Sequence, residues 1–173
     1  MNTTLNDILT RRSVRKYKSD MVPDELIQQI TEAGSYAATG MGKQSPIILA
    51  VTNQKIRNQL SKINAQIMGT DSDPFYGAPV VLVVLADKNR PTHVYDGSLV
   101  MGNLMLAAHA LGLGSCWIHR AKETFETEEG KTLLKQLGIE GDYEGIGNCI
   151  IGYCDEAEAD AAPRKSDYIH YVK

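Results

Sequence analysis

The sequence predicts a single α+β domain in which helices flank a central β-sheet. Two patterns support this prediction: short continuous apolar runs of strand length, and longer segments whose apolar residues recur at helical spacing. A chain of 173 residues is long enough for one domain with a sizeable core and too short for two domains that each have such a core. We therefore expect residues 1–173 to form one domain.

The clearest strand signal is the run Ala-Pro-Val-Val-Leu-Val-Val-Leu-Ala at residues 78–86. Its continuous β-branched character predicts burial on both faces, at the centre of the sheet. A shorter apolar run at residues 47–51 predicts a second buried strand. Two further strands are predicted directly after Gly114 and at residues 148–153.

Five helices are predicted around these strands. Thr4 is the expected N-cap of the first helix, whose apolar residues lie on one face. Pro23 fits the first turn of the second helix, where two acidic residues follow it and complement the helix dipole. Thr127 is expected to cap the last helix, which ends at Gly138. The remaining helical patterns span residues 55–67 and 95–111.

Composition excludes several classes of protein. The net charge of −3 and pI near 5.8 argue against a general surface for nucleic acid or for acidic membranes. The N-terminus lacks a signal-peptide pattern and no window is apolar enough to cross a bilayer, so we expect a cytoplasmic protein. Cys116, Cys149 and Cys154 show no Cys-x-x-Cys spacing and the four histidines are scattered, so we expect neither a disulfide framework nor a metal site.

One basic segment stands out against this acidic background: Arg11-Arg12-Ser13-Val14-Arg15-Lys16-Tyr17. Guanidinium groups present forked, permanently charged donors that match phosphate oxygens, and a serine hydroxyl can add a short bond to the same group. The alternative is a solvated basic helix end, where cations complement the helix dipole. On these residues alone both interpretations stay open.

This segment, followed by Val22-Pro23-Asp24-Glu25-Leu26, resembles the opening of the nitroreductase family of FMN-dependent oxidoreductases. Later segments resemble the same family in the same order: Ala78-Pro79, then Gly112-Leu113-Gly114-Ser115, then Pro163-Arg164-Lys165. The resemblance covers almost the whole chain. It implies a nitroreductase-like fold with a central mixed β-sheet, and a homodimer with FMN sites at its interface.

The resemblance also implies the residues that bind FMN. The phosphate is expected to be held by Arg11, Arg12, Ser13, Arg15, Arg164 and Lys165. Gly114 leads to backbone against the flavin ring, which would bring Trp117, Ile118, His119 and Arg120 near its reactive face, with a backbone donor around His119 or Arg120 close to N5. No catalytic side chain is expected, because the flavin carries the redox chemistry.

The loop at residues 39–46 is expected to approach the flavin from the partner subunit. Its glycines permit close backbone approach, and Gly42, Lys43 and Gln44 are the expected contacts. The sequence departs from the commoner family pattern here, since Gly42 stands where asparagine is frequent and Ser45 separates Gln44 from Pro46. Without the resemblance, this loop is a plain helix-to-strand connection, and Arg164 and Lys165 are surface residues.

The Gly112-x-Gly114 spacing is not a dinucleotide-binding fingerprint. It follows a helix and leads into a strand, and Trp117 stands where a third glycine belongs. A glycine C-cap followed by a short strand accounts for the same residues.

The resemblance implies an enzyme in which NADH or NADPH delivers hydride to FMN, which then reduces a small acceptor such as a nitroaromatic compound or a quinone. One cavity that admits donor and acceptor by turns predicts ping-pong kinetics. An enone or a halogenated aromatic compound remains open as the acceptor. Two alternatives are a flavin-binding redox sensor or store without substantial turnover, and a module that binds another phosphorylated ligand through the basic clusters.

Overall fold

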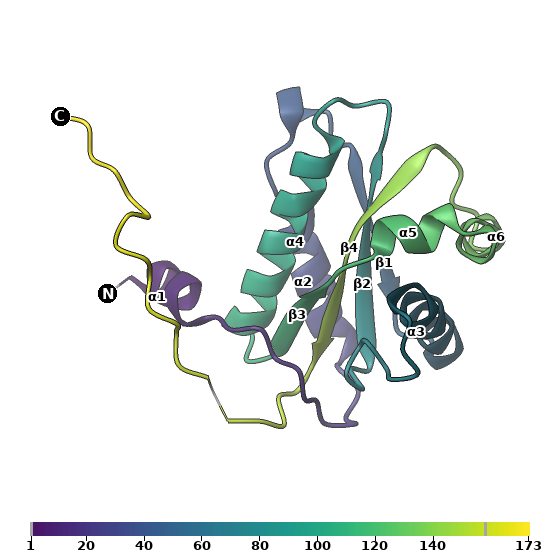
Figure 1. Cartoon of the computed structure of the whole chain (residues 1–173), viewed down its shortest axis with the longest axis horizontal. Coiled ribbons are helices and arrows are strands. Elements are labelled where there is room, and N and C mark those ends of the chain that lie inside the picture. Colours follow the sequence, from purple (N-terminus) through teal and green to yellow (C-terminus); the bar gives the residue numbers. More distant parts are fainter. Residues whose placement is uncertain (1, 158) are drawn as a thin grey trace.

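A computed structural model of the chain describes residues 2–157 and 159–173. The elements are arranged as a sheet between two layers of helices (Figure 1). The strands are β1 (Pro46–Val51), β2 (Val80–Asp87), β3 (Gly114–Ile118) and β4 (Tyr143–Gly152). The helices are α1 (Thr3–Thr10), α2 (Asp24–Ser35), the short 3-10 helix η1 (Gly40–Gly42), α3 (Gln54–Met68), α4 (His93–Ala110), α5 (Ala121–Glu126) and α6 (Glu128–Gln136).

The α+β class is confirmed, but the direction of the strands differs from the expected mixed sheet. The strand order is β1-β2-β4-β3, and each neighbouring pair is antiparallel. Among the described residues, the one parallel pairing is the isolated bridge between Ser13 and Ser115. An apolar run predicts that a strand is buried on both faces. A central strand can be buried in this way in a parallel or an antiparallel sheet, so the run does not reveal the direction of its neighbours.

The predicted central strand is confirmed as β2, whose residues from Val80 to Ala86 are all 0% exposed. Its side chains alternate between two cores. Leu82 and Val84 pack with α2 and α4, whereas Val83 and Leu85 pack on the face covered by α3, α5 and α6 (Figure 1). Complete burial stabilises the fold by about 1.5–3 kcal/mol for each Val or Leu side chain. Because its side chains enter both cores, β2 is the strand that joins them.

The strand predicted at residues 47–51 exists as β1, but the prediction that it is buried was wrong. Most of its residues are half-buried and Ala50 is exposed. The reason is its position: β1 pairs with β2 along one side only, which makes it the edge of the sheet. Edge strands carry unpaired backbone groups and are available for pairing with another segment.

Two predicted helix caps are corrected by the structure. The side chain of Asn2, not Thr4, accepts the backbone N–H groups at the start of α1. Pro23 is the N-cap of α2 rather than a residue of its first turn. The predicted cap of α6 is confirmed, because Thr127 Oγ1 accepts the N–H of Gly130 at 3.0 Å.

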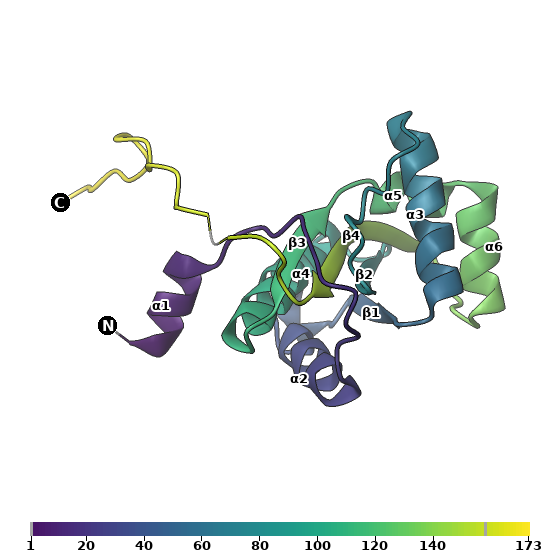
Figure 2. The same cartoon turned by 90° about the horizontal axis from the view of Figure 1, so that it is seen from below.

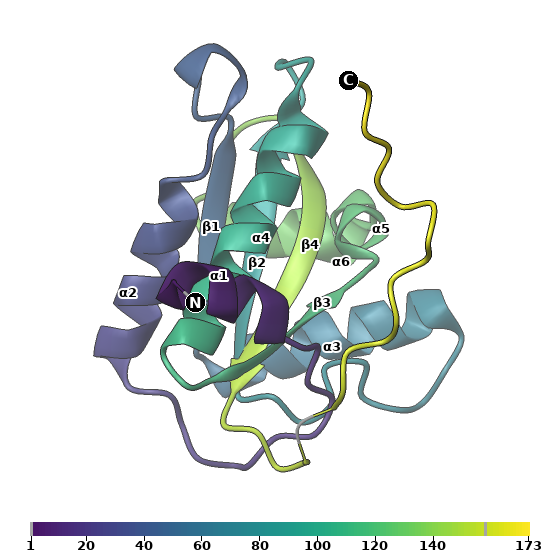
Figure 3. The same ribbon diagram turned by 90° about the vertical axis from the view of Figure 1, so that its left-hand side faces the viewer.

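Helix α1 and the C-terminal segment project from the same side of the body (Figures 1 and 2). Figure 3 views the molecule from this side, with α1 in front and the C-terminal segment beside it. No residue of α1 is buried, and its apolar residues Leu5, Ile8 and Leu9 are each more than half exposed. Across the described part of the chain, no helix has both the length and the apolar character needed to span a bilayer.

Candidate functional site

The basic segment predicted to bind phosphate crosses one end of the sheet. Val14 N–H donates to the carbonyl of Ser115 at 3.0 Å, and Lys18 N–H donates to that of Tyr153 at 2.9 Å. Gly114 allows the close approach, because a Cβ there would lie 2.9 Å from Cγ2 of Val14. The segment is therefore fixed against β3 and the end of β4.

A buried tyrosine locks the same segment. The hydroxyl of Tyr17 donates to the carbonyl of Val14 at 2.7 Å. Burial raises the pKa of Tyr17 well above its ordinary range, and the neighbouring thiol of Cys116 adds to the effect. The phenol therefore stays protonated and remains a donor, which ties the backbone at Val14 to Tyr17.

Two arginine donors in this segment are buried without a partner. Arg12 Nη1 donates to the carbonyls of Leu9 and Arg11, each at 2.8 Å. In contrast, Arg11 Nη1 and Arg12 Nε are sealed from solvent and make no hydrogen bond within the described chain. A buried unpaired donor costs about 1–3 kcal/mol, and more when it is charged. Such donors indicate an anionic ligand that satisfies them.

Two pockets follow β3 from its first residue to its last. The first, of about 230 Å3, is lined by Arg12, Ser13 and Gly114, together with Thr10, Val14, His109, Gly112, Leu113, Cys154, Glu156, Ala157 and Ala159. The second, of about 240 Å3, is lined by Arg15, Trp117, Ile118, His119 and Arg120, together with Met68, Ser72, Pro74, Tyr76 and Cys116. Each pocket thus combines residues of the basic segment with predicted residues at one end of β3.

The turn after β3 has an unusual backbone. Arg120 adopts the left-handed conformation, with φ 71°, which costs a non-glycine residue about 1 kcal/mol. Within residues 2–157 and 159–173, the backbone N–H groups of His119 and Arg120 donate to no other part of the chain. Both donors are therefore available to a ligand in the second pocket.

Sequence reasoning missed Asn64, which contacts this turn. Asn64 is fully buried in α3, where its side chain bonds to both His119 and Arg120. A signal was present in the sequence, because Asn64 follows Leu60 by four residues and so interrupts an apolar helical stripe.

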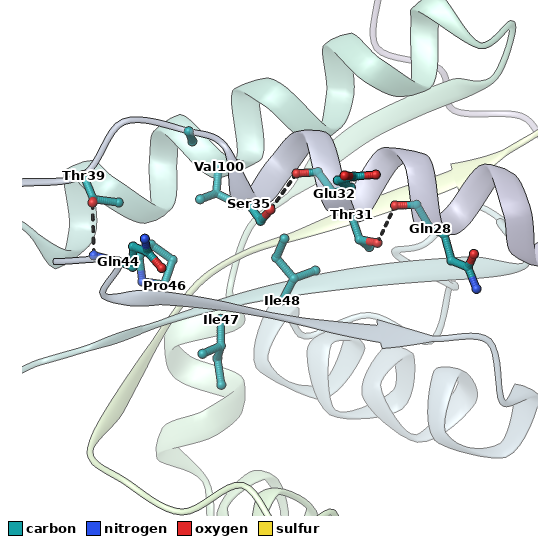
Figure 4. Close-up of a pocket in the computed structure, with 11 residues that line it drawn as sticks. Gln28, Thr31, Glu32, Ser35, Thr39, Gln44, Pro46, Ile47, Ile48 and Val100 are labelled. Carbon is teal, nitrogen blue, oxygen red and sulfur yellow. Dashed lines mark hydrogen bonds between the residues drawn. The ribbon is translucent and has the colours of Figure 1, made fainter. Parts of the chain in front are cut away.

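The loop predicted to contact the flavin lies away from both pockets. Gly42 and Lys43 belong to the turn around η1, whose backbone bends through left-handed conformations at Met41, Gly42 and Gln44. Gln44 lines a separate groove of about 710 Å3 between α2 and β1. In Figure 4, Thr39 and Gln44 lie at one end of this groove and Gln28 lies at the other. Within one chain, therefore, residues 42–44 do not join the other predicted residues.

Arg164 and Lys165 also lie apart from the N-terminal arginines. Both are exposed on the C-terminal segment and line neither pocket along β3. The Arg164 guanidinium donates to the carbonyl of Ala162 at 2.8 Å, and Lys165 Nζ lies 3.9 Å from a carboxylate oxygen of Asp167. The predicted convergence of the two basic clusters does not occur within a single chain.

Comparisons with known proteins identify the family to which the chain belongs. A model of the nitroreductase family matches residues 8–153. A protein of Methanothermobacter thermautotrophicus, described as an NADH dehydrogenase/NAD(P)H nitroreductase, is 31% identical over 122 residues, which are 65% of this chain and 59% of that protein. The present chain thus spans less than two thirds of the length of that relative.

Two crystal structures of nitroreductases with bound FMN are similar over the full length of both chains. The one from Bacteroides fragilis has a TM-score of 0.88 at 28% identity, covering 100% of each chain. The one from Desulfitobacterium hafniense has a TM-score of 0.89 at 26% identity, with the same coverage of 100%. With the family match extending from α1 to the end of β4, the chain belongs to the nitroreductase family.

Proposed function

We propose that the chain is an FMN-dependent oxidoreductase that takes hydride from NADH or NADPH and reduces a small acceptor, such as a nitroaromatic compound or a quinone. One observation carries the proposal: Arg11 and Arg12 keep buried guanidinium nitrogens without partners, directly before Ser13. A phosphate satisfies such donors, because its oxygens accept the forked N–H groups of guanidinium. FMN is a phosphate-bearing flavin, and the two similar crystal structures contain it.

The residues along β3 fit the two ends of FMN. Arg12 and Ser13, which line the first pocket beside Gly114, would hold the phosphate together with Arg11, which directly precedes them. The flavin ring would lie toward Ile118, in the pocket that Arg15 shares with the turn after β3. The free N–H groups of this turn would donate to heteroatoms of the ring.

When bound, FMN supplies the redox chemistry, because it accepts hydride from a nicotinamide and passes electrons to an acceptor. The chain itself would bind the cofactor and orient it. The guanidinium groups would hold the phosphate, and Trp117 and Ile118 would form part of the wall of the second pocket. A single pocket that admits the nicotinamide and the acceptor by turns leads to ping-pong kinetics.

The proposal includes a homodimer, which would supply the predicted residues that the single chain leaves apart. The apolar stripe of α1 is uncovered, and so are Tyr168, Ile169, Tyr171 and Val172 in the C-terminal segment. Uncovered apolar stretches of this kind mark contact surfaces. A second copy of the chain is the expected partner, with residues 42–44 of the partner facing the flavin ring.

The C-terminal segment of the second copy is expected to bind in the groove between α2 and β1. The wall of this groove combines the unpaired edge of β1 with apolar side chains such as Pro46 and Ile48 (Figure 4). An extended segment can pair with a free strand edge through its main chain. Reaching this groove would draw Arg164 and Lys165 of one copy over the body of the other.

Flavin content and reduction test the proposed function. The purified protein should show the yellow flavin band, directly or after incubation with FMN, and anaerobic NADH or NADPH should bleach it. Arg15→Ala should weaken FMN binding about tenfold or more, since a charged hydrogen bond contributes about 1.5–3 kcal/mol. Lys18→Ala removes the same charge three residues further along the chain, outside both pockets, and it should retain flavin.

Three results would count against the proposal. A protein that stays colourless after incubation with FMN is not a flavoprotein. A band that neither nicotinamide bleaches indicates a flavin store. Full flavin content in Arg15→Ala contradicts the place given to that residue.

A further inference from the structure

Asn64 is buried with 0% of its surface exposed, yet both ends of its amide group are used. Its Nδ2 donates to the carbonyl of His119 at 2.8 Å, and its Oδ1 accepts from Nε of Arg120 at 3.0 Å. One side chain of α3 therefore holds the backbone of one residue and the side chain of the next. Polar groups buried this completely persist in folded proteins when they are fully paired.

A second amide reinforces the same carbonyl. Asn148, which is 1% exposed in β4, places its Nδ2 3.4 Å from the carbonyls of both Ile118 and His119. Two buried amides from different elements thus converge on the turn after β3. Backbone in the left-handed region is kept at a non-glycine residue only when its surroundings fix it, and these contacts fix Arg120.

We infer that Asn64 is a positioning residue, which aims the free backbone N–H of Arg120, and the Arg120 guanidinium, into the pocket shared with Arg15. The inference rests on the proposed function, because it assigns that pocket to the flavin ring. The carbonyl of His119 and the N–H of Arg120 belong to one peptide unit and point in opposite directions, so a carbonyl held toward α3 directs the Arg120 N–H away from α3. The His119 N–H belongs to the preceding peptide unit, whose Ile118 carbonyl is contacted by Asn148. The hydrogen bond to Arg120 Nε leaves the remaining guanidinium nitrogens free at the pocket wall.

Two substitutions separate positioning from packing. Asn64→Leu removes both hydrogen bonds and keeps the branched shape of the side chain. Asn64→Asp keeps the acceptor for Arg120 but, when ionised, loses the donor to the His119 carbonyl. Each variant should weaken FMN binding about tenfold, measured by quenching of flavin fluorescence on titration.

The Asn64→Asp variant has a pH signature that a general packing defect lacks. A protonated carboxyl regains the donor, so the ratio of variant to wild-type Kd for FMN should fall toward one as the pH is lowered. Measuring both proteins at each pH cancels the titration of the FMN phosphate itself. Asn103→Asp is the matched control, because Asn103 Nδ2 also donates to a backbone carbonyl, that of Ala33 at 3.0 Å, but lies outside both pockets.

Hydrogen exchange in the cofactor-free protein provides a readout that does not need FMN. The amide of Thr124, which donates to the Arg120 carbonyl at 2.9 Å, should exchange at least tenfold faster in Asn64→Leu and Asn64→Asp than in the wild type. If the wild type binds no FMN, the proposed function fails, but hydrogen exchange still tests whether Asn64 holds the turn after β3. The inference is overturned if exchange of the Thr124 amide is unchanged, or if Asn103→Asp reproduces the loss of FMN affinity and its pH dependence.

Discussion

The hydroxyl of Ser45 donates to the carboxylate of Asp96 at 2.7 Å, a bond that ties the loop before β1 to the first turn of α4. The same carboxylate accepts the N–H of Gly40 at 3.0 Å and the hydroxyl of Thr92 at 3.1 Å. Asp96 is 3% exposed, so these contacts are largely shielded from water. One buried carboxylate therefore holds both ends of the loop that carries residues 42–44.

Asp96→Asn should loosen this loop. The amide keeps the size of the carboxyl but loses the negative charge that strengthens three hydrogen bonds, so we expect a cost of about 1.5–3 kcal/mol in the free energy of unfolding. Chemical denaturation measures the cost, and cleavage by trypsin at Lys43 measures the mobility of the loop. Ser45→Ala should cost less, about 1 kcal/mol, and the double variant should fall short of the sum. Full additivity would show that the two side chains act independently.

Asp73 predicts how stability changes in acid. Burial opposes ionisation of this carboxyl, but hydrogen bonds from Arg57, Ser61 and two backbone N–H groups outweigh it and lower its pKa below the ordinary 3.8. Its ion pair with Arg57, 2.6 Å long, is 6% exposed on the arginine side and 34% on the aspartate side. A carboxyl with a lowered folded-state pKa stabilises the fold above 3.8, and this contribution is lost as the pH falls through the folded-state value.

Asp73→Asn should therefore be clearly less stable than the wild type at neutral pH. The difference should shrink as the pH falls from the ordinary pKa of 3.8 through the lower folded-state value, because the wild-type carboxyl is then protonated first in the unfolded chain and finally in the folded protein. Urea unfolding at several pH values measures it. The neighbouring exposed residue provides a control, since Asp71→Asn should change the unfolding midpoint little at any pH. A gap between Asp73→Asn and the wild type that widens in acid would contradict the assignment.

The parts of the fold that depend on local pattern were predictable, and those that depend on distant partners were not. The continuous run at residues 78–86 allowed only a central strand, and Thr127 gave the start of α6. The run at residues 47–51 does not reveal whether the strand lies at the edge or the centre of the sheet, because strand order depends on distant parts of the chain. Helix α5, six residues long, is too short for a periodic pattern. The places of Gln44 and Arg164 depend on long-range packing, which no local signal encodes.

Arg11→Met separates a ligand-binding role from a structural one. The wild-type Nη1 is buried without a partner, so replacing the guanidinium with an apolar chain should leave the cofactor-free protein equally or more stable. FMN binding should weaken about 10- to 100-fold, the equivalent of about 1.5–3 kcal/mol for a charged hydrogen bond. Thermal unfolding without FMN and a flavin titration measure the two effects. Arg90→Met, which removes an exposed charge outside both pockets, should change neither. A large loss of cofactor-free stability in Arg11→Met would assign Arg11 to the fold.

Removing residues 161–173 tests whether the C-terminal segment joins two copies. In the single chain these residues are exposed and add nothing to either core, so the shortened protein should fold. If the segment lies in the groove of a second copy, the shortened protein should shift from dimer to monomer in sedimentation velocity and lose FMN. The full-length double variant Arg164→Ala/Lys165→Ala should remain a dimer, because its apolar residues are intact, but bind FMN more weakly. A shortened protein that stays dimeric and keeps its flavin would show that the segment neither bridges the copies nor reaches the phosphate.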